Sequence, residues 1–312
     1  MAKVGLVYSD IYLAHETGDH PECPERLRAI VAHLQQSGTW DKCRVFEPRA
    51  ADVEDLLMVH TESHVFRVQR FCHEGKRYLD PDTVVCPASF DVARAAVGGV
   101  FVAIDQVMLR EVDRAMALVR PPGHHAGADR ARGFCLFNNI ALGARYAQRR
   151  HGLKRVLIVD FDVHHGNGTQ DIFEEDDSVF YFSMHRWPFY PGTGAAERKG
   201  TGRGKGFTFN LPLAATTDRE TTVSLFEQSL ADVAERFTPD IVLVSAGFDA
   251  YADDPIAGLG LQPRDFRAMT AAIVALADKA CRGRVVSTLE GGYDLKALGP
   301  CVEQHLKAMM ES

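Results

Sequence analysis

The sequence lacks the features that mark several large classes of protein. Its seven cysteines are odd in number and form no C-x-x-C pair, which fits reduced thiols in the cytosol better than a disulfide framework or a cysteine-ligated zinc. No stretch approaches 18 uninterrupted apolar residues, and the N-terminus MAKVGLVYSD has no signal-peptide pattern. A basic excess is also missing, because the net charge is −7. The sequence therefore predicts a cytoplasmic protein that binds neither membranes nor nucleic acid, although a local basic patch stays open.

Several catalytic signatures are absent as well. There is no G-x-S-x-G elbow, no P-loop and no G-x-G-x-x-G after a strand, so serine hydrolases, nucleotide hydrolases and dinucleotide enzymes lack their sequence support. The run TGRGKG at Thr201–Gly206 is glycine-rich and basic, but it lacks the strand-to-helix context of a phosphate loop and is interpreted as a flexible loop.

What the sequence does contain is a regular alternation of apolar strands and amphipathic helices. Its 312 residues are 46% hydrophobic and 25% charged, with no Ser/Gly linker and no internal repeat, so residues 1–312 are expected to form a single doubly wound α/β domain. The expected helices are Pro24–Gln36, Val53–Cys72, Ala88–Leu109, Asn139–His151 and Thr221–Phe237. The expected strands are Lys3–Tyr8, Arg44–Glu47, Ala115–Arg120, Val156–Val159, Val179–His185, Gly206–Leu213, Ile241–Val244 and Val285–Leu289.

The stretch Arg155–Gln170, RVLIVDFDVHHGNGTQ, joins a buried strand to metal-binding residue types. Residues two apart in an extended chain point the same way, so Asp160, Asp162 and His164 are expected to share one face. Two carboxylates and an imidazole could hold a divalent cation, whereas a capped strand end with an ordinary histidine is the alternative. Glycines then allow a sharp turn.

Three other strands also end in polar residues: His124-His125 follow the third predicted strand, Asp249 the seventh and Tyr293 the eighth. Ligands of open α/β sheets bind beyond the carboxyl ends of the strands, so these side chains are expected to converge. A three-ligand metal leaves a position open for water, the histidines supply an acid and a base, and the phenol supplies a donor to the developing oxyanion. The pattern predicts hydrolysis of a carbonyl bond. By contrast, His60 and His64 are four apart on a mixed face and are interpreted as ordinary helix surface.

At these residues the sequence resembles the zinc-dependent histone deacetylase superfamily, specifically the class II-like branch with the bacterial histone-deacetylase-like amidohydrolases. The resemblance covers nearly the whole chain in family order. It rests on HPECPERL (20–27), RPPGHHA (120–126), GFCLFNN (133–139), VDFDVHHGNGTQ (159–170), PFYPGTG (188–194), SAGFDA (245–250) and LEGGYDL (289–295). It implies the arginase–deacetylase fold, an eight-stranded parallel sheet flanked by helices.

The resemblance also implies a role for each matching residue. Asp162, His164 and Asp249 become ligands of Zn²⁺, or alternatively Fe²⁺ or Co²⁺. His124 and His125 become the catalytic pair, oriented by Asp160 and Asn167, and Tyr293 polarises the carbonyl. Because class I relatives carry Asp where this chain has Asn167, His125 is inferred to be the less basic general acid–base group. Gly133, Phe134, Tyr190 and Ile256 are expected to contact the substrate. Structural K⁺ is implied at two sites, one with Asp160, Asp162, His164, Ser183 and Met184 and one with Phe173, Asp176, Val179 and Phe207.

Alternative functions differ at identifiable positions. A binuclear manganese ureohydrolase such as arginase needs two further carboxylates, where this chain has Gly166 and Tyr251. A degenerate binding module would have lost a ligand, a histidine or the tyrosine, and none is lost. An acetylpolyamine amidohydrolase keeps every catalytic residue and stays as the alternative to a deacetylase of acyl-lysine side chains in peptides or proteins. The motifs leave the natural substrate, the acyl-chain length, the resident metal and the oligomeric state open.

Overall fold

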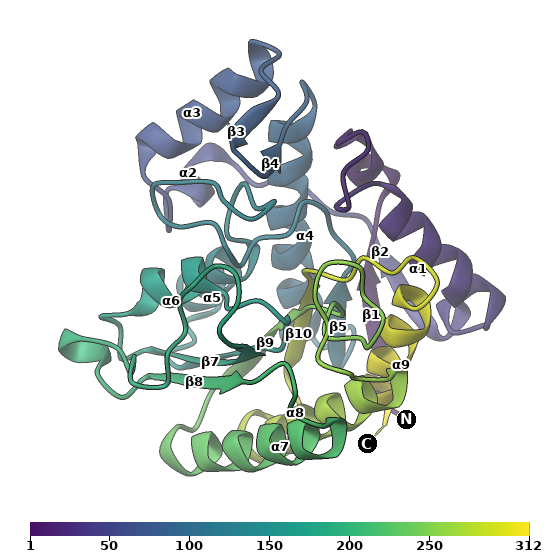
Figure 1. The fold of residues 1–312 in the computed structure, drawn as a ribbon, viewed down its shortest axis with the longest axis vertical. Coiled ribbons are helices and arrows are strands. Elements are labelled where there is room, and N and C mark those ends of the chain that lie inside the picture. Colours follow the sequence, from purple (N-terminus) through teal and green to yellow (C-terminus); the bar gives the residue numbers. More distant parts are fainter. Residues whose placement is uncertain (312) are drawn as a thin grey trace.

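A parallel β-sheet runs through the centre of the molecule (Figure 1). The computed structural model describes residues 1–311. The eight strands lie in the order β2-β1-β5-β10-β9-β6-β7-β8, and every neighbouring pair is parallel. Their bounds are β1 (Val4–Val7), β2 (Cys43–Phe46), β5 (Arg114–Ala117), β6 (Val156–Asp160), β7 (Val179–Arg186), β8 (Thr208–Leu213), β9 (Ile241–Ala246) and β10 (Val285–Leu289).

Helices cover both faces of this sheet (Figure 1). One face is covered by α4 (Ser89–Met108) and α5 (Asn139–His151), and the other by α1 (Glu25–Gln36), α7 (Arg219–Arg236), α8 (Pro263–Cys281) and α9 (Leu298–Met310). The central strands are buried along their whole length, which explains why they are mostly apolar and show no polar alternation. The expected fold class, a single α/β domain with an eight-stranded parallel sheet, is confirmed.

The remaining elements lie around the carboxyl edge of the sheet and its flanks. They are α2 (Val53–Leu56), α3 (Glu62–His73), α6 (Asn167–Phe173), the hairpin β3 (Tyr78–Asp80) and β4 (Thr83–Val84), and the 3₁₀ helices η1 (Asp10–Ala14), η2 (Trp40–Lys42) and η3 (Gly202–Gly204). The hairpin, α8 and α9 were not predicted. The expected helix Val53–Cys72 is two helices, because the chain turns after Leu57 and Thr61 caps α3 by accepting a bond from the backbone of His64.

The interpretation of His60 and His64 as helix surface is wrong. Both side chains are buried. His60 Nδ1 lies 2.9 Å from the Gly127 carbonyl, its Nε2 accepts a bond from the Asn138 backbone, and His64 Nε2 lies 2.9 Å from the Leu136 carbonyl. The two rings therefore brace the segment 126–138, which folds over them from a distant part of the sequence.

No helix within residues 1–311 combines the length and the apolar character required to cross a membrane.

Candidate active site

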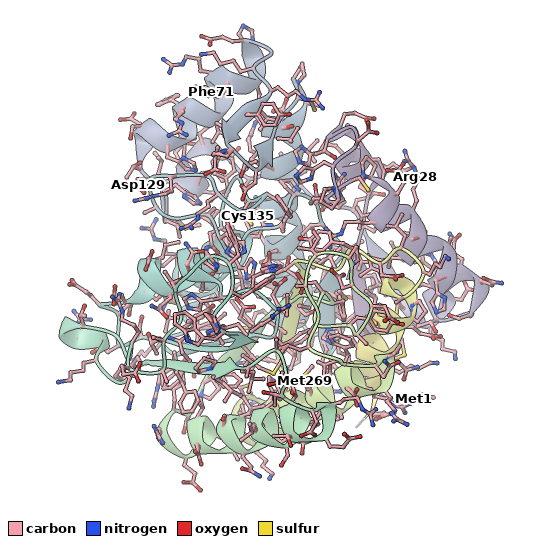
Figure 2. The ribbon with its side chains drawn as sticks, viewed as in Figure 1. Met1, Arg28, Phe71, Asp129, Cys135 and Met269 are labelled. Atoms are coloured by element: carbon pink, nitrogen blue, oxygen red, sulfur yellow. The ribbon has the colours of Figure 1, made fainter. Side chains whose placement is uncertain are left out.

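The candidate residues follow four adjacent strands and lie at one edge of the sheet. In the order β5-β10-β9-β6, the chain leaves the carboxyl ends of these strands toward His124, Tyr293, Asp249 and Asp162. Connections beyond the carboxyl ends of parallel strands can meet in this way although they are far apart in sequence. Figure 2 shows Cys135, from the connection that follows the histidine pair, near the centre of the molecule, whereas Asp129 of the same connection lies nearer the periphery.

Asp162, His164 and Asp249 form a buried cluster whose ligand atoms all lie within 4.8 Å of one another. The His164 Nδ1 is 3.1 Å from Oδ1 of Asp162 and 3.1 Å from Oδ2 of Asp249. Strand β6 ends at Asp160, so the expected extended spacing does not continue to His164. The convergence comes instead from a bent loop, in which the backbone of His164 donates to Asp162 Oδ1.

The donor set of this cluster fits a divalent cation. The backbone N–H of Gly291 donates to Asp162 Oδ2 (2.8 Å) and that of Val163 to Asp249 Oδ1 (3.0 Å). Each carboxylate thus has one oxygen facing the imidazole nitrogen, and the backbone holds the other; in Asp162 the oxygen that faces the imidazole also accepts from the His164 backbone. Burial, followed by the charge of Asp162, raises the pKa of Asp249 to about 7. A cation would relieve this repulsion, and two oxygens with one nitrogen suit a catalytic zinc with an open position.

Glycines make room for the cluster. A Cβ on Gly247 would lie 2.0 Å from Asp162 Oδ2, and one on Gly291 would lie 2.1 Å from Asp249 Oδ2. Gly166 likewise lets the backbone lie close to a carboxylate, since a Cβ there would meet Asp160 Oδ2 at 2.2 Å. Its φ of −74° is not in the left-handed region. The expected sharp turn is present, because the Asn167 backbone donates to the His165 carbonyl (2.8 Å) across Gly166, but glycine is required there for space and not for the turn conformation.

The adjacent histidines have different partners. The Nδ1 of His124 is 3.0 Å from Asp160 Oδ2, and the Nδ1 of His125 is 2.8 Å from Asn167 Oδ1. Burial alone would lower the pKa of His124, but the charges of Asp160 and Asp162 outweigh it and raise the pKa to about 10. Burial and the nearby His124 hold the pKa of His125 well below its usual range. One imidazole is thus set up as a cation and the other as a neutral group.

A cavity of about 250 Å³ leads to these side chains. Its wall contains the four residues expected to contact the substrate, namely Gly133, Phe134, Tyr190 and Ile256. Residues that the sequence analysis gave no role also line it: Asp82, Pro122, Phe189 and Gly291. Four residues from the sheet edge also line it: His124, His125, His164 and Tyr293. Burial raises the pKa of the Tyr293 phenol well above its usual value, so the phenol stays protonated. The cavity therefore places an aromatic wall over the metal cluster.

Gly133 and Phe134 hold unusual backbone conformations at this wall. Their φ angles are 57° and 70°, and a Cβ on Gly133 would lie 2.4 Å from the His125 ring. The unpredicted hairpin fixes them, because Asp82 Oδ1 accepts from the Gly133 backbone (3.0 Å) and Thr83 Oγ1 from that of Phe134 (3.2 Å). A non-glycine residue at positive φ persists only where its surroundings hold it.

Two further buried carboxylates were missed. Asp254 is buried and accepts backbone bonds from Tyr293 (2.7 Å), Asp294 (3.3 Å) and Ile256 (3.0 Å). Glu290 stands in the quoted motif LEGGYDL without an assigned role, and its side chain is fully buried. Its position directly after a buried strand was the available signal.

The residues expected around potassium lie in two groups. Ser183 pairs with Asp160 in the β6–β7 register, which brings Ser183 and Met184 beside the loop of Asp162 and His164. The second group lies along the connection from α6 to β7, with Phe173, Asp176 and Val179, and at Phe207 just before β8. There the Asp176 backbone donates to the Phe173 carbonyl, and Arg145 pairs with the Asp176 carboxylate at 2.6 Å. Potassium at both groups stays a prediction.

Comparison with known proteins agrees with this architecture. The sequence model of the histone deacetylase domain matches residues 20–309. A probable deacetylase of Archaeoglobus fulgidus is 39% identical over 309 residues, which cover 98% of this chain and 86% of the relative. A histone deacetylase-like amidohydrolase of Pseudomonas aeruginosa is 39% identical over 275 residues, 88% of this chain and 72% of the relative. The crystal structure of the HDA15 HD domain superposes with a TM-score of 0.93 at 38% identity, covering 99% of this chain and 88% of that one.

These matches define a hydrolase of amides that is built on a parallel α/β fold. The chain belongs to the histone deacetylase family, whose members are metal-dependent, typically with Zn²⁺, and include deacetylases and amidohydrolases. The expected family and enzyme class are confirmed. Within residues 1–311, no second carboxylate cluster accompanies the three-residue site, in keeping with Gly166 and Tyr251 at the positions where a binuclear ureohydrolase needs further ligands.

Proposed function

We propose that this protein is a zinc-dependent deacetylase that hydrolyses N-acetyl or longer N-acyl amides on lysine side chains of peptides or proteins. One observation carries the proposal: an apolar cavity of about 250 Å³, walled by Phe134, Phe189 and Tyr190, ends at the metal cluster and the histidine pair. The four methylenes of a lysine side chain suit such a wall, and the amide at their end would reach the cluster. Residues 1–312 are proposed to form one catalytic domain.

Asp162, His164 and Asp249 would hold the zinc ion, with Fe²⁺ or Co²⁺ as alternatives. When bound, the metal supplies Lewis acidity toward the amide carbonyl and toward water. Tyr293 borders the same cavity, and its protonated phenol would donate to the carbonyl oxygen as that oxygen gains charge.

His125 is proposed as the general base and then the general acid. Its Nδ1–H donates to the amide oxygen of Asn167, so the other ring nitrogen carries the lone pair and borders the cavity. This nitrogen would accept a proton from the attacking water and pass it to the leaving amine nitrogen. The products are a carboxylate and a free lysine amine. His124, held by Asp160, would remain an imidazolium that stabilises negative charge.

The charge of the residues in and around the cavity wall helps to distinguish acyl-lysine substrates from acetylpolyamines. A polyamine carries extra ammonium groups and needs a matching anion. Asp254 accepts three backbone bonds, so it is poorly placed to serve as that anion, and Ile256 beside it is apolar. This supports acyl-lysine. Asp82, however, lines the cavity and is the observation that favours an acetylpolyamine amidohydrolase as the second candidate.

The proposal includes a cytoplasmic location and no nucleic-acid or membrane partner. It is supported by seven free cysteines and a net charge of −7. Structural K⁺ at the two groups of residues described above is also part of it.

The test is a turnover screen with enzyme stripped of metal and reloaded with one equivalent of Zn²⁺. Acetyl-lysine peptides, a ladder of longer acyl-lysine peptides and acetylated polyamines are compared by release of free amine. We expect hydrolysis of at least one acyl-lysine peptide that depends on added metal. Failure of every acyl-lysine substrate, with turnover of an acetylpolyamine, would transfer the assignment to the second candidate.

A further inference from the structure

Glu290 is a buried carboxylate whose side chain touches the histidine-bearing segment. It follows β10 directly, and its side chain is 0% exposed. Its Oε2 accepts from the backbone of Gly123 (2.7 Å) and of His124 (3.2 Å), and its Oε1 accepts from Ser245 Oγ (3.0 Å). Among the ion pairs of residues 1–311, none includes this carboxylate. Burial of an unpaired carboxylate is unfavourable, so its presence beside His124 calls for a role.

The contacts of Glu290 complement those of Asp160. Asp160, at the end of β6, holds the His124 imidazole through Nδ1. Glu290, at the end of β10, holds the main chain of the same residue, and Ser245 on the intervening strand β9 links to it. His124 is thus fixed at two points by carboxylates from two strands, which defines both the position and the orientation of its ring.

The backbone segment that Glu290 holds is closely packed and lies near the metal cluster. A Cβ on Gly123 would meet the Asn139 backbone nitrogen at 2.5 Å, so this backbone is packed against the start of α5. The His124 Nε2 is 3.9 Å from Asp162 Oδ1, and its ring centroid is 4.0 Å from that of His125. A shift of the Gly123–His124 backbone would therefore move both imidazoles relative to the metal cluster.

We infer that Glu290 is a positioning residue for the histidine pair, acting through the main-chain bonds to Gly123 and His124. The inference rests on the proposed function, because it assigns Glu290 a task in that reaction. Glu290 does not touch the substrate. Its carboxylate sets the distance from the imidazoles to the reacting amide, and a misplacement of about 1 Å lowers the rate steeply.

Replacing Glu290 by glutamine and by alanine distinguishes the need for its hydrogen bonds from the need for its negative charge. In Glu290→Gln the amide oxygen can still accept the backbone bonds, and its NH₂ can donate to the Ser245 hydroxyl. In Glu290→Ala the two N–H groups lose their acceptor. We expect Glu290→Ala to lower kcat roughly 10- to 100-fold, with KM changed by less than about threefold and one equivalent of zinc retained. Glu290→Gln should restore kcat to within about threefold of the wild type.

The matched control is Glu303→Ala. Glu303 is a buried carboxylate of α9 that contacts Thr39, His33 and Lys307, and it lies outside the cavity wall. Its loss should lower the Tm and leave kcat unchanged. If Glu290→Ala does not fold, Glu290→Asp takes its place, because the shorter side chain withdraws the carboxylate by one methylene and should also lower kcat.

A second readout is independent of turnover. Nitrogen-15 NMR of labelled histidines, with the His124 signal assigned by His124→Ala, should show that signal displaced in Glu290→Ala and unmoved in Glu290→Gln and Glu303→Ala. A wild-type enzyme inert on all acyl substrates would refute the proposed function, and this displacement would still establish the positioning. The inference is overturned if folded, zinc-loaded Glu290→Ala has wild-type kcat and an unmoved His124 signal, or if Glu290→Gln is as impaired as Glu290→Ala.

Discussion

His125 donates to an amide and not to a carboxylate: its Nδ1 lies 2.8 Å from Oδ1 of Asn167. An amide carries no charge to stabilise an imidazolium, and burial already holds the pKa of His125 well below its usual range. The neighbouring His124 has the opposite surroundings, with Asp160 at 3.0 Å. The two adjacent histidines are therefore chemically distinct.

Asn167→Asp should raise the pKa of His125, because the new carboxylate stabilises its protonated form. The neutral form that acts as a base would then exist only at higher pH. We expect the acidic limb of the kcat/KM profile to move up by about one pH unit or more, with bound zinc unchanged. The measurement is a pH–rate profile on zinc-loaded enzyme, and an unmoved acidic limb would contradict the role of His125 as the base.

Chelation should abolish activity, and one equivalent of Zn²⁺, or of Fe²⁺ or Co²⁺, should restore it. His164→Ala and Asp249→Ala each remove one of three convergent ligand atoms, so both should lose metal. Metal content by elemental analysis, measured with folding by circular dichroism, checks this. Full activity of metal-free protein would refute the mechanism.

Tyr293→Phe removes one hydroxyl from the cavity and leaves the three ligands intact. If the phenol is a single oxyanion donor, kcat should fall roughly 10²- to 10³-fold while the metal stays bound. Single-turnover kinetics with measured zinc content would separate this loss from weaker substrate binding. A near-wild-type kcat would remove Tyr293 from the proposed chemistry.

Glu22→Gln should destabilise the fold by about 3–5 kcal/mol, because it leaves the buried Arg120 without its anion, which pairs with it at 2.8 Å. Burial opposes ionisation of Glu22, but the Arg120 charge prevails and lowers its pKa to about 2. A lowered pKa stabilises the fold fully above the unfolded value of 4.5, and the contribution is lost as the pH falls toward 2. Wild type and variant should therefore differ in urea unfolding at pH 7 and converge in acid. Glu25→Gln, at an exposed ion pair with Arg28, is the control and should have little effect.

The fold could be predicted because its sheet is buried on both faces. The central strands are mostly apolar and lead into polar residues, as at Val156–Asp160, so the eight strands and the edge where Asp162, Asp249 and Tyr293 meet follow from the sequence. The hairpin at Tyr78–Val84 was missed because it is short, partly polar and interrupted by Pro81.

The supporting carboxylates could not be predicted in the same way. Glu290 and Asp254 accept from backbone N–H groups, and the partners of Glu290 lie 166 and 167 residues away. Backbone donors are present at every residue but proline, so the position of Glu290 directly after a buried strand signals that it could have a role but does not identify its partners. The burial of His60 was not predicted for a related reason, since the segment 126–138 that covers it is remote in sequence.

Competition between acetyl-lysine peptides and acetylpolyamines distinguishes the two candidate substrates. The rim residue Ile256 offers no charge, and Asp254 is engaged by backbone groups, which leaves Asp82 as the carboxylate of the cavity wall. We expect an acetyl-lysine peptide to have the higher kcat/KM against N-acetylputrescine or N8-acetylspermidine. Ile256→Glu should narrow the gap by adding an anion at the rim, and Asp82→Asn should widen it by removing one.

The assay should be run at low ionic strength, because exposed charges are least screened there and electrostatic attraction favours a polyamine most. Ile256→Gln is the matched control for Ile256→Glu, because it changes size and polarity without adding charge. If acetylpolyamines are preferred by more than about tenfold under these conditions, roughly 1.4 kcal/mol of transition-state binding separates the substrates in their favour. Asp82 would then be the anion that a polyamine ammonium requires, and its loss should reverse the preference.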